Sequence, residues 1–136
     1  MSTVAPVKRA MVQAMRASSP LVAAIVGGVN EGMAPRKVRY PFIVYQLVSS
    51  VRERQFDGQQ IHSLWDVSVY AENPVDANNV DALVNAALDD KDLAVDGQTT
   101  MLCRRVTDLP TGPDIDSRGR RIWQAGGSYS VWTDLT

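Results

Sequence analysis

Two stretches, YPFIVYQLVSSV (residues 40–51) and IHSLWDVSVYA (residues 61–71), decide the fold of this chain. In the second stretch, one face would carry Ile61, Trp65 and Val67, with more polar residues at the positions between them. This period of two predicts a β-strand. The polar segment between the stretches ends in a turn signal at Phe56-Asp57-Gly58, so the two strands are predicted to form a hairpin that projects from the body.

Helices are predicted on both sides of this hairpin. An apolar stripe predicts one helix over residues 3–18, and Ser19-Pro20 starts a second, shorter one that ends at Gly27-Gly28. Asn73-Pro74 combines a capping residue with a proline at the first helical position, and the helix that follows reaches about Leu88. Its apolar residues recur at helical spacing, which indicates a face packed against the strands.

The rest of the chain predicts further strands and one long loop. Strands are expected over residues 93–95, 100–106 and 121–132, with a bulge or bend at Gly126-Gly127. Prolines and glycines make residues 108–119 the most loop-like segment. The predicted fold is α+β, a mainly antiparallel sheet with an N-terminal helix pair and one central helix packed on it, plus the projecting hairpin and the long loop. A single domain would span residues 1–136.

Composition excludes several function classes. Fourteen basic residues stand against fifteen acidic ones, so the net charge is -1, unlike the clearly basic proteins that wrap nucleic acid. One cysteine and one histidine cannot build the usual disulfide, zinc or histidine-dependent sites. The longest strongly apolar stretch, Leu21 to Val26, is far too short to span a membrane, and the N-terminus has no signal-peptide pattern. We therefore expect a soluble protein with a buried Cys103.

Few residues suggest catalysis or a cofactor. The sequence has no glycine-rich phosphate loop and no metal-ligand motif. A pair formed by Cys103 and His62 is conceivable, although no third residue that would orient it is evident. Asp114 and Asp116 could hold a cation, but their spacing is not that of a calcium loop. We expect no cofactor and no metal, and a small ligand-binding domain or enzyme remains an alternative.

The layout of charge points to self-association. Basic residues dominate from residue 36 to residue 54, and acids dominate from residue 72 to residue 96. Two complementary patches on one subunit favour a head-to-tail contact that can close into a ring. The residues expected on the basic side of this contact are Arg36, Lys37, Arg39, Arg52 and Arg54. Those expected on the acidic side are Asp76 and Asp81.

The predicted loop at 108–119 is a candidate for a second contact. It carries Asp114, Asp116 and Arg118 within five residues. Long polar extensions on a small body often become ordered against a partner. We therefore expect these three residues to contact another protein.

Several segments together resemble a known family. They are Val26-Gly27-Gly28, Ala34-Pro35, the YPFIVY strand at 40–45, the WDVSVYA strand at 65–71, and Tyr129-Ser130-Val131. In this order and spacing, across residues 7–132, the chain resembles the tail-completion or tail-terminator proteins of bacteriophages with long, non-contractile tails.

The resemblance implies a structural role in a virion. Such proteins form a hexameric ring at the head-proximal end of the tail tube, stop its growth and provide the joint to the head connector. The partners implied are copies of this chain, a tail-tube protein and a head–tail connector protein, with DNA passing through the ring without specific binding and with no membrane. The protein would be made in the host cytoplasm and would end in the virion. A different neck component, such as a head-completion or connector protein, is the alternative.

Overall fold

The computed structural model describes residues 5–34, 38–55, 58–91, 99–116 and 118–135. The elements follow one another as α1 (Ala5–Ala17), α2 (Ser19–Ala24), β1 (Val29–Glu31), β2 (Phe42–Gln55), β3 (Gly58–Ala71), α3 (Pro74–Leu88), β4 (Thr99–Ile115) and β5 (Arg121–Leu135). The strands form one five-stranded sheet in the order β1-β2-β3-β5-β4. Among the strands of the described residues, only the pairing of β1 with β2 is parallel. The predicted α+β class with a mainly antiparallel sheet is confirmed.

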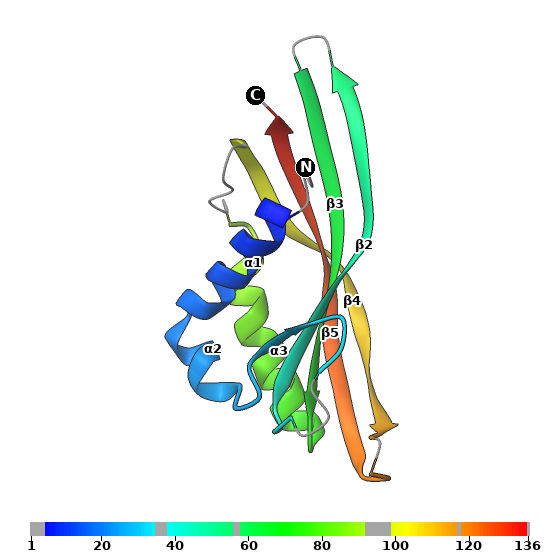
Figure 1. Ribbon diagram of the computed structural model, residues 1–136. Coiled ribbons are helices and arrows are strands. Elements are labelled where there is room, and N and C mark those ends of the chain that lie inside the picture. The colour runs from blue at the N-terminus through cyan, green and yellow to red at the C-terminus, as the bar shows by residue number, and fades with distance from the viewer. Residues whose placement is uncertain (1–4, 35–37, 56–57, 92–98, 117, 136) are drawn as a thin grey trace.

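The predicted hairpin is formed by β2 and β3. Its register runs from Phe42 opposite Tyr70 to Gln55 opposite Gly58, with one shift between Leu47 and Ser49. Figure 1 shows that the far part of this hairpin extends past the helices, which lie over the other end of the sheet. The hairpin therefore projects from the body, as its polar tip predicts.

All three helices pack on one face of the sheet (Figure 1). The helices contribute Val7, Met11, Met15, Leu21, Val80, Val84 and Leu88 to the core. The strands contribute Ile43, Tyr45, Trp65, Val67, Val69, Cys103, Tyr129 and Val131. Removing this apolar surface from water is the main favourable contribution to folding. No helix within the described ranges is long and apolar enough to cross a membrane.

The central helix begins as the sequence predicts. Asn73 caps α3, since its Oδ1 accepts a hydrogen bond of 2.8 Å from the backbone N–H of Asp76, and Pro74 occupies the first helical position. Asp76 lies in the first turn, where the helix dipole stabilises a negative charge.

The loop predicted at residues 108–119 is much shorter than expected. Strand β4 continues to Ile115, and β5 begins at Arg121. Prolines disfavour a strand, but β4 lies at the edge of the sheet, where a missing N–H can be tolerated on the outer side. Three register shifts against β5 accommodate the irregular sequence. The strand predicted at 93–95 lies outside the described residues.

A bulge does lie at the glycine pair of β5, as predicted, but its extra residue belongs to the neighbouring strand β4. Gly126 and Gly127 keep a continuous register with Ser68 and Val67 of β3, and the nearest register shift lies on β4, between Leu109 and Gly112. The glycines also make room for other groups. A Cβ atom at Gly127 would lie 2.5 Å from Nε of Arg105, and one at Gly126 would overlap the backbone oxygen of Val67.

Candidate interaction surfaces

The elements near the two edges of the sheet differ in their balance of charge. Around α1, β1 and β2, the exposed or half-exposed charged residues are Lys8, Arg9, Arg16, Glu31 and Arg52. Around α3 and the adjoining part of β4, they are Asp76, Asp81, Asp89, Asp90, Lys91, Arg104, Arg105 and Asp108. Bases outnumber acids in the first set and acids outnumber bases in the second. β2 and β4 lie on opposite sides of β3 and β5, so the strand residues of the two sets are far apart, whereas the helix residues approach each other where α1 packs against α3.

The predicted basic residues do not form one compact patch. Arg39 precedes β2, whereas Arg52 lies near its far end, and both side chains are exposed. At about 3.3 Å per residue, the strand between them separates the two by roughly 35–40 Å. Arg54 also belongs to the far end of β2, while Arg36 and Lys37 lie outside the described residues.

Arg105 of β4 organises the acidic side from within the subunit. Its guanidinium donates to both carboxylate oxygens of Asp81, at 3.0 and 2.9 Å, and to Oδ1 of Asp108 at 2.7 Å. It also donates to the backbone oxygen of Gly126 at 2.8 Å and to the hydroxyl of Tyr129 at 3.2 Å. The side chains of Arg105 and Asp81 are only 13% and 17% exposed, so this ion pair is largely buried.

The Arg105 network was missed by sequence reasoning, which placed Asp81 in a subunit contact. The structure shows that Asp81 neutralises Arg105, and Asp76 alone of the two predicted acids is exposed. The available signal was the glycine pair at 126–127, because glycine in a strand often marks the close approach of another group. Its partner could not be identified without the register between β4 and β5.

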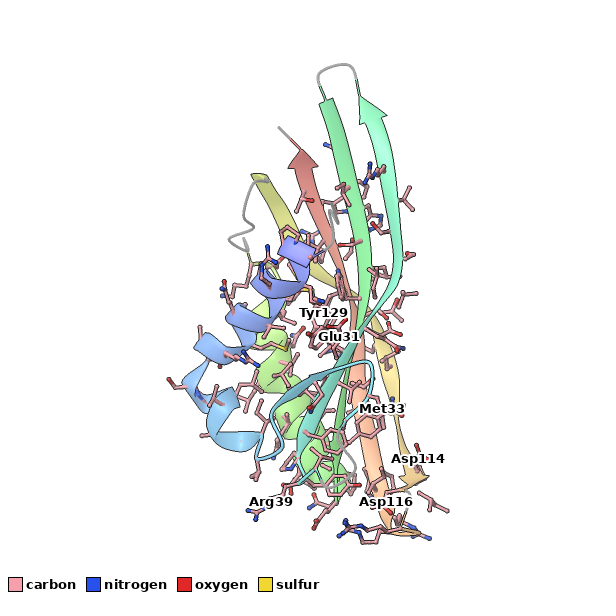
Figure 2. The ribbon with its side chains drawn as sticks, in the orientation of Figure 1. Glu31, Met33, Arg39, Asp114, Asp116 and Tyr129 are labelled. Carbon is pink, nitrogen blue, oxygen red and sulfur yellow. The ribbon has the colours of Figure 1, made fainter. Side chains whose placement is uncertain are left out.

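The Asp116 side chain orders the turn between β4 and β5. It accepts hydrogen bonds from the backbone N–H groups of Arg118 and Arg120, at 2.9 and 2.8 Å, and from the hydroxyl of Tyr40 at 3.0 Å. The bond from the Arg120 backbone is the main cause of a lowered pKa for Asp116. Asp114 and Arg118 are exposed beside it. Figure 2 shows Asp114, Asp116 and Arg39 at the same end of the sheet.

A groove of about 550 Å³ lies next to this turn. Its residues are Gly32, Met33, Ala34, Val38, Tyr40, Phe42, Val44, Tyr70, Asp116, Arg118, Arg120 and Ile122. The rings of Phe42 and Tyr70 stack with centroids 5.2 Å apart. The turn residues therefore border an apolar concavity on the sheet face that the helices leave open.

The structure separates the one conceivable catalytic pair. Cys103 is fully buried and belongs to the core beneath the helices. His62 lies on the opposite sheet face, where its ring stacks on Trp132 with centroids 4.1 Å apart and its Nε2 is 2.6 Å from the hydroxyl oxygen of Ser130. The two side chains do not meet, so this nucleophile–base arrangement is not formed.

Burial of Cys103 predicts a loss of stability at high pH. Burial raises the pKa of its thiol from 9.0 to about 12, and burial likewise raises the pKa of Tyr129 to about 12. Between these values the unfolded chain releases protons that the folded chain keeps, so the free energy of unfolding falls as pH rises from about 9 towards 12. Urea unfolding at pH 8 and at pH 10.5 checks this. Replacing Cys103 by alanine should make the drop between the two pH values smaller, and an equal drop would contradict the assignment.

Comparisons with known proteins identify a family and two solved structures of similar fold. Residues 9–111 match the family model described as "Tail completion protein gp17". One similar solved structure is a chain of the "Virion of native gene transfer agent (GTA) particle", with a TM-score of 0.71, 15% identity, and coverage of 98% of this chain and 99% of that one. A second has a TM-score of 0.55, 13% identity, and coverage of 100% and 97%. No curated protein matches the sequence. At identities of 15% and 13%, these two structures show that the chain shares their fold.

Proposed function

Because the chain belongs to the family of the tail completion protein gp17, a family of structural proteins of the phage tail, we propose that it caps the head-proximal end of a tail tube. Several copies form a ring there, which ends tube growth and provides the joint to the head connector. The likeness in fold to a chain of a virion particle supports this proposal.

The single observation that carries the ring is that a base and exposed acids lie at opposite edges of the sheet. Arg52 lies on the side of β2, and the exposed acids Asp90 and Asp108, which also pair with Arg104 and Arg105 of their own subunit, lie on the side of β4. A surface that complements a different surface on the same molecule makes a heterologous contact, and repetition of that contact closes a ring when the rotation permits. The hexamer is part of the proposal.

The open face of the sheet suits a lining past which DNA moves. Strands β3 and β5 place Asp66, Ser68 and Gln124 half-exposed on this face, and Ser128 and Ser130 lie buried beside them. Asp66 accepts a hydrogen bond of 2.6 Å from the hydroxyl of Ser128. Phosphates are held mainly by lysine and arginine. These five side chains carry no positive charge, which supports passage of DNA without specific binding.

Tail assembly in the presence and absence of the protein tests this function. Tails made without it should be longer than normal and uneven in length, because nothing stops growth of the tube. Adding the purified protein during assembly should restore a uniform length. Electron microscopy should then show a sixfold ring at one end of each tail.

The same preparations separate the alternatives. Copurification with filled heads in place of tails would support a head-completion or connector protein and would contradict tube capping. The groove beside Asp116 and Arg118 is the proposed contact for the neighbouring virion protein. If a variant with both His62 and Cys103 replaced still restored uniform tail length, that result would further count against an enzyme.

A further inference from the structure

The far part of β2 exposes aliphatic side chains along an edge that no other strand covers. Strand β1 pairs only with Ile43–Tyr45, and beyond Tyr45 no described strand pairs with the outer side of β2. Val48 and Val51 lie on this uncovered part and are 51% and 50% exposed. Exposed apolar residues on a sheet edge promote association with another chain.

The opposite edge of the sheet has a matching feature. Val106 lies in β4 at the register shift between Arg105 and Thr107, and it is 52% exposed. Asp108 is two residues further along the same strand, and its side chain pairs with Arg105 of its own subunit while staying 84% exposed. Each edge therefore combines an exposed valine with a nearby charged residue. On β2, Arg52 follows Val51, and on β4, Asp108 lies near Val106.

We infer that a second copy of this chain covers the β2 edge, with Val106 of one subunit packed against Val48 and Val51 of the next. This inference rests on the proposed ring and identifies the apolar centre of its subunit contact. The opposite charges of Arg52 and Asp108 favour this orientation over contact between two β2 edges.

Side chains, and not a shared ladder of backbone hydrogen bonds, make this contact. Strand β4 has three register shifts against β5 and contains Pro113, and β2 has its own shift between Leu47 and Ser49. Irregular edges of this kind oppose continuous pairing between copies. Three valines cover far less than the roughly 800 Å² per partner of a standard interface, so they form its centre within a charged rim.

Lysine substitutions on the β2 edge test the inference. The double variant Val48→Lys, Val51→Lys should keep the circular dichroism spectrum of the wild type and lose ring formation in solution and on tails, at low and high salt alike. The matched control is Val22→Lys with Val26→Lys, at two exposed valines in and just after α2, which adds the same charge and should form rings as the wild type does. Normal rings from the double variant would overturn the inference.

Cysteine pairs give a second test that does not depend on adding charge. Val51→Cys and Val106→Cys in one chain lie on opposite edges of the sheet and cannot join within a subunit. Mild oxidation of assembled rings should link neighbouring subunits into covalent oligomers, and either single variant should give none. If wild-type rings form but no such links appear, the inference fails while the proposed function stands. If the wild type caps no tails, the proposed function fails.

Discussion

Replacing Arg105 by methionine is expected to lower the free energy of unfolding by roughly 3 kcal/mol, the lower end of the range for breaking a buried ion pair. Methionine keeps much of the apolar stem but leaves the Asp81 carboxylate without the two hydrogen bonds that it now accepts. Because Asp81 is only 17% exposed, water cannot fully replace them. Urea or thermal unfolding followed by circular dichroism measures the loss.

The neighbouring arginine provides the control. Arg104 pairs with Asp90 at 3.4 Å, but both side chains are largely exposed, so Arg104→Met should change stability by less than about 0.5 kcal/mol. Adding Asp81→Asn to Arg105→Met should recover part of the loss, because a neutral amide is cheaper to bury without a charged partner. Equal effects of the two arginine variants would show that the Arg105 network contributes no more than a surface pair.

Reversal of two charges at the far end of β2, Arg52→Glu and Arg54→Glu, is expected to abolish ring formation and leave the fold intact. The change would place like charges against the acids proposed to face this edge, among them Asp108. Sedimentation and electron microscopy at low salt, where charge effects between exposed groups are strongest, measure the outcome. The free energy of unfolding should stay close to that of the wild type.

A matched charge change elsewhere separates a local contact from an effect of net charge. Arg118→Glu with Arg121→Glu alters the net charge by the same amount, at two exposed positions in the turn after β4 and at the start of β5. This variant should still form rings. Rings that persist unchanged at low salt in the Arg52/Arg54 variant would remove the electrostatic part of the proposed contact.

Much of the fold could be predicted from local patterns. Alternation of apolar residues identifies β3, and the Asn73-Pro74 pair locates the start of α3, because a strand period and a helix cap each depend on residues close together in the sequence. The same local reasoning misjudged β4. Pro110, Gly112 and Pro113 disfavour a central strand, but an edge strand with register shifts accepts them.

The candidate surfaces were less predictable than the fold. The sequence places Arg39 and Arg52 in one basic segment, but the length of β2 holds them far apart. It also places Asp81 on a helix with no sign of a buried partner. Arg105 reaches Asp81 only because β4 lies beside β5 and α3 packs over both.

The sequence by itself determined the types and order of the main elements, the shortage of catalytic side chains and the uneven distribution of charge along the chain. Tertiary structure alone decided which side chains share a face or an edge. It put Cys103 under the helices and His62 on the open face, and it set Val51 and Val106 on opposite edges. The physical reason is that strand order and register depend on contacts between residues distant in sequence, which no local pattern specifies.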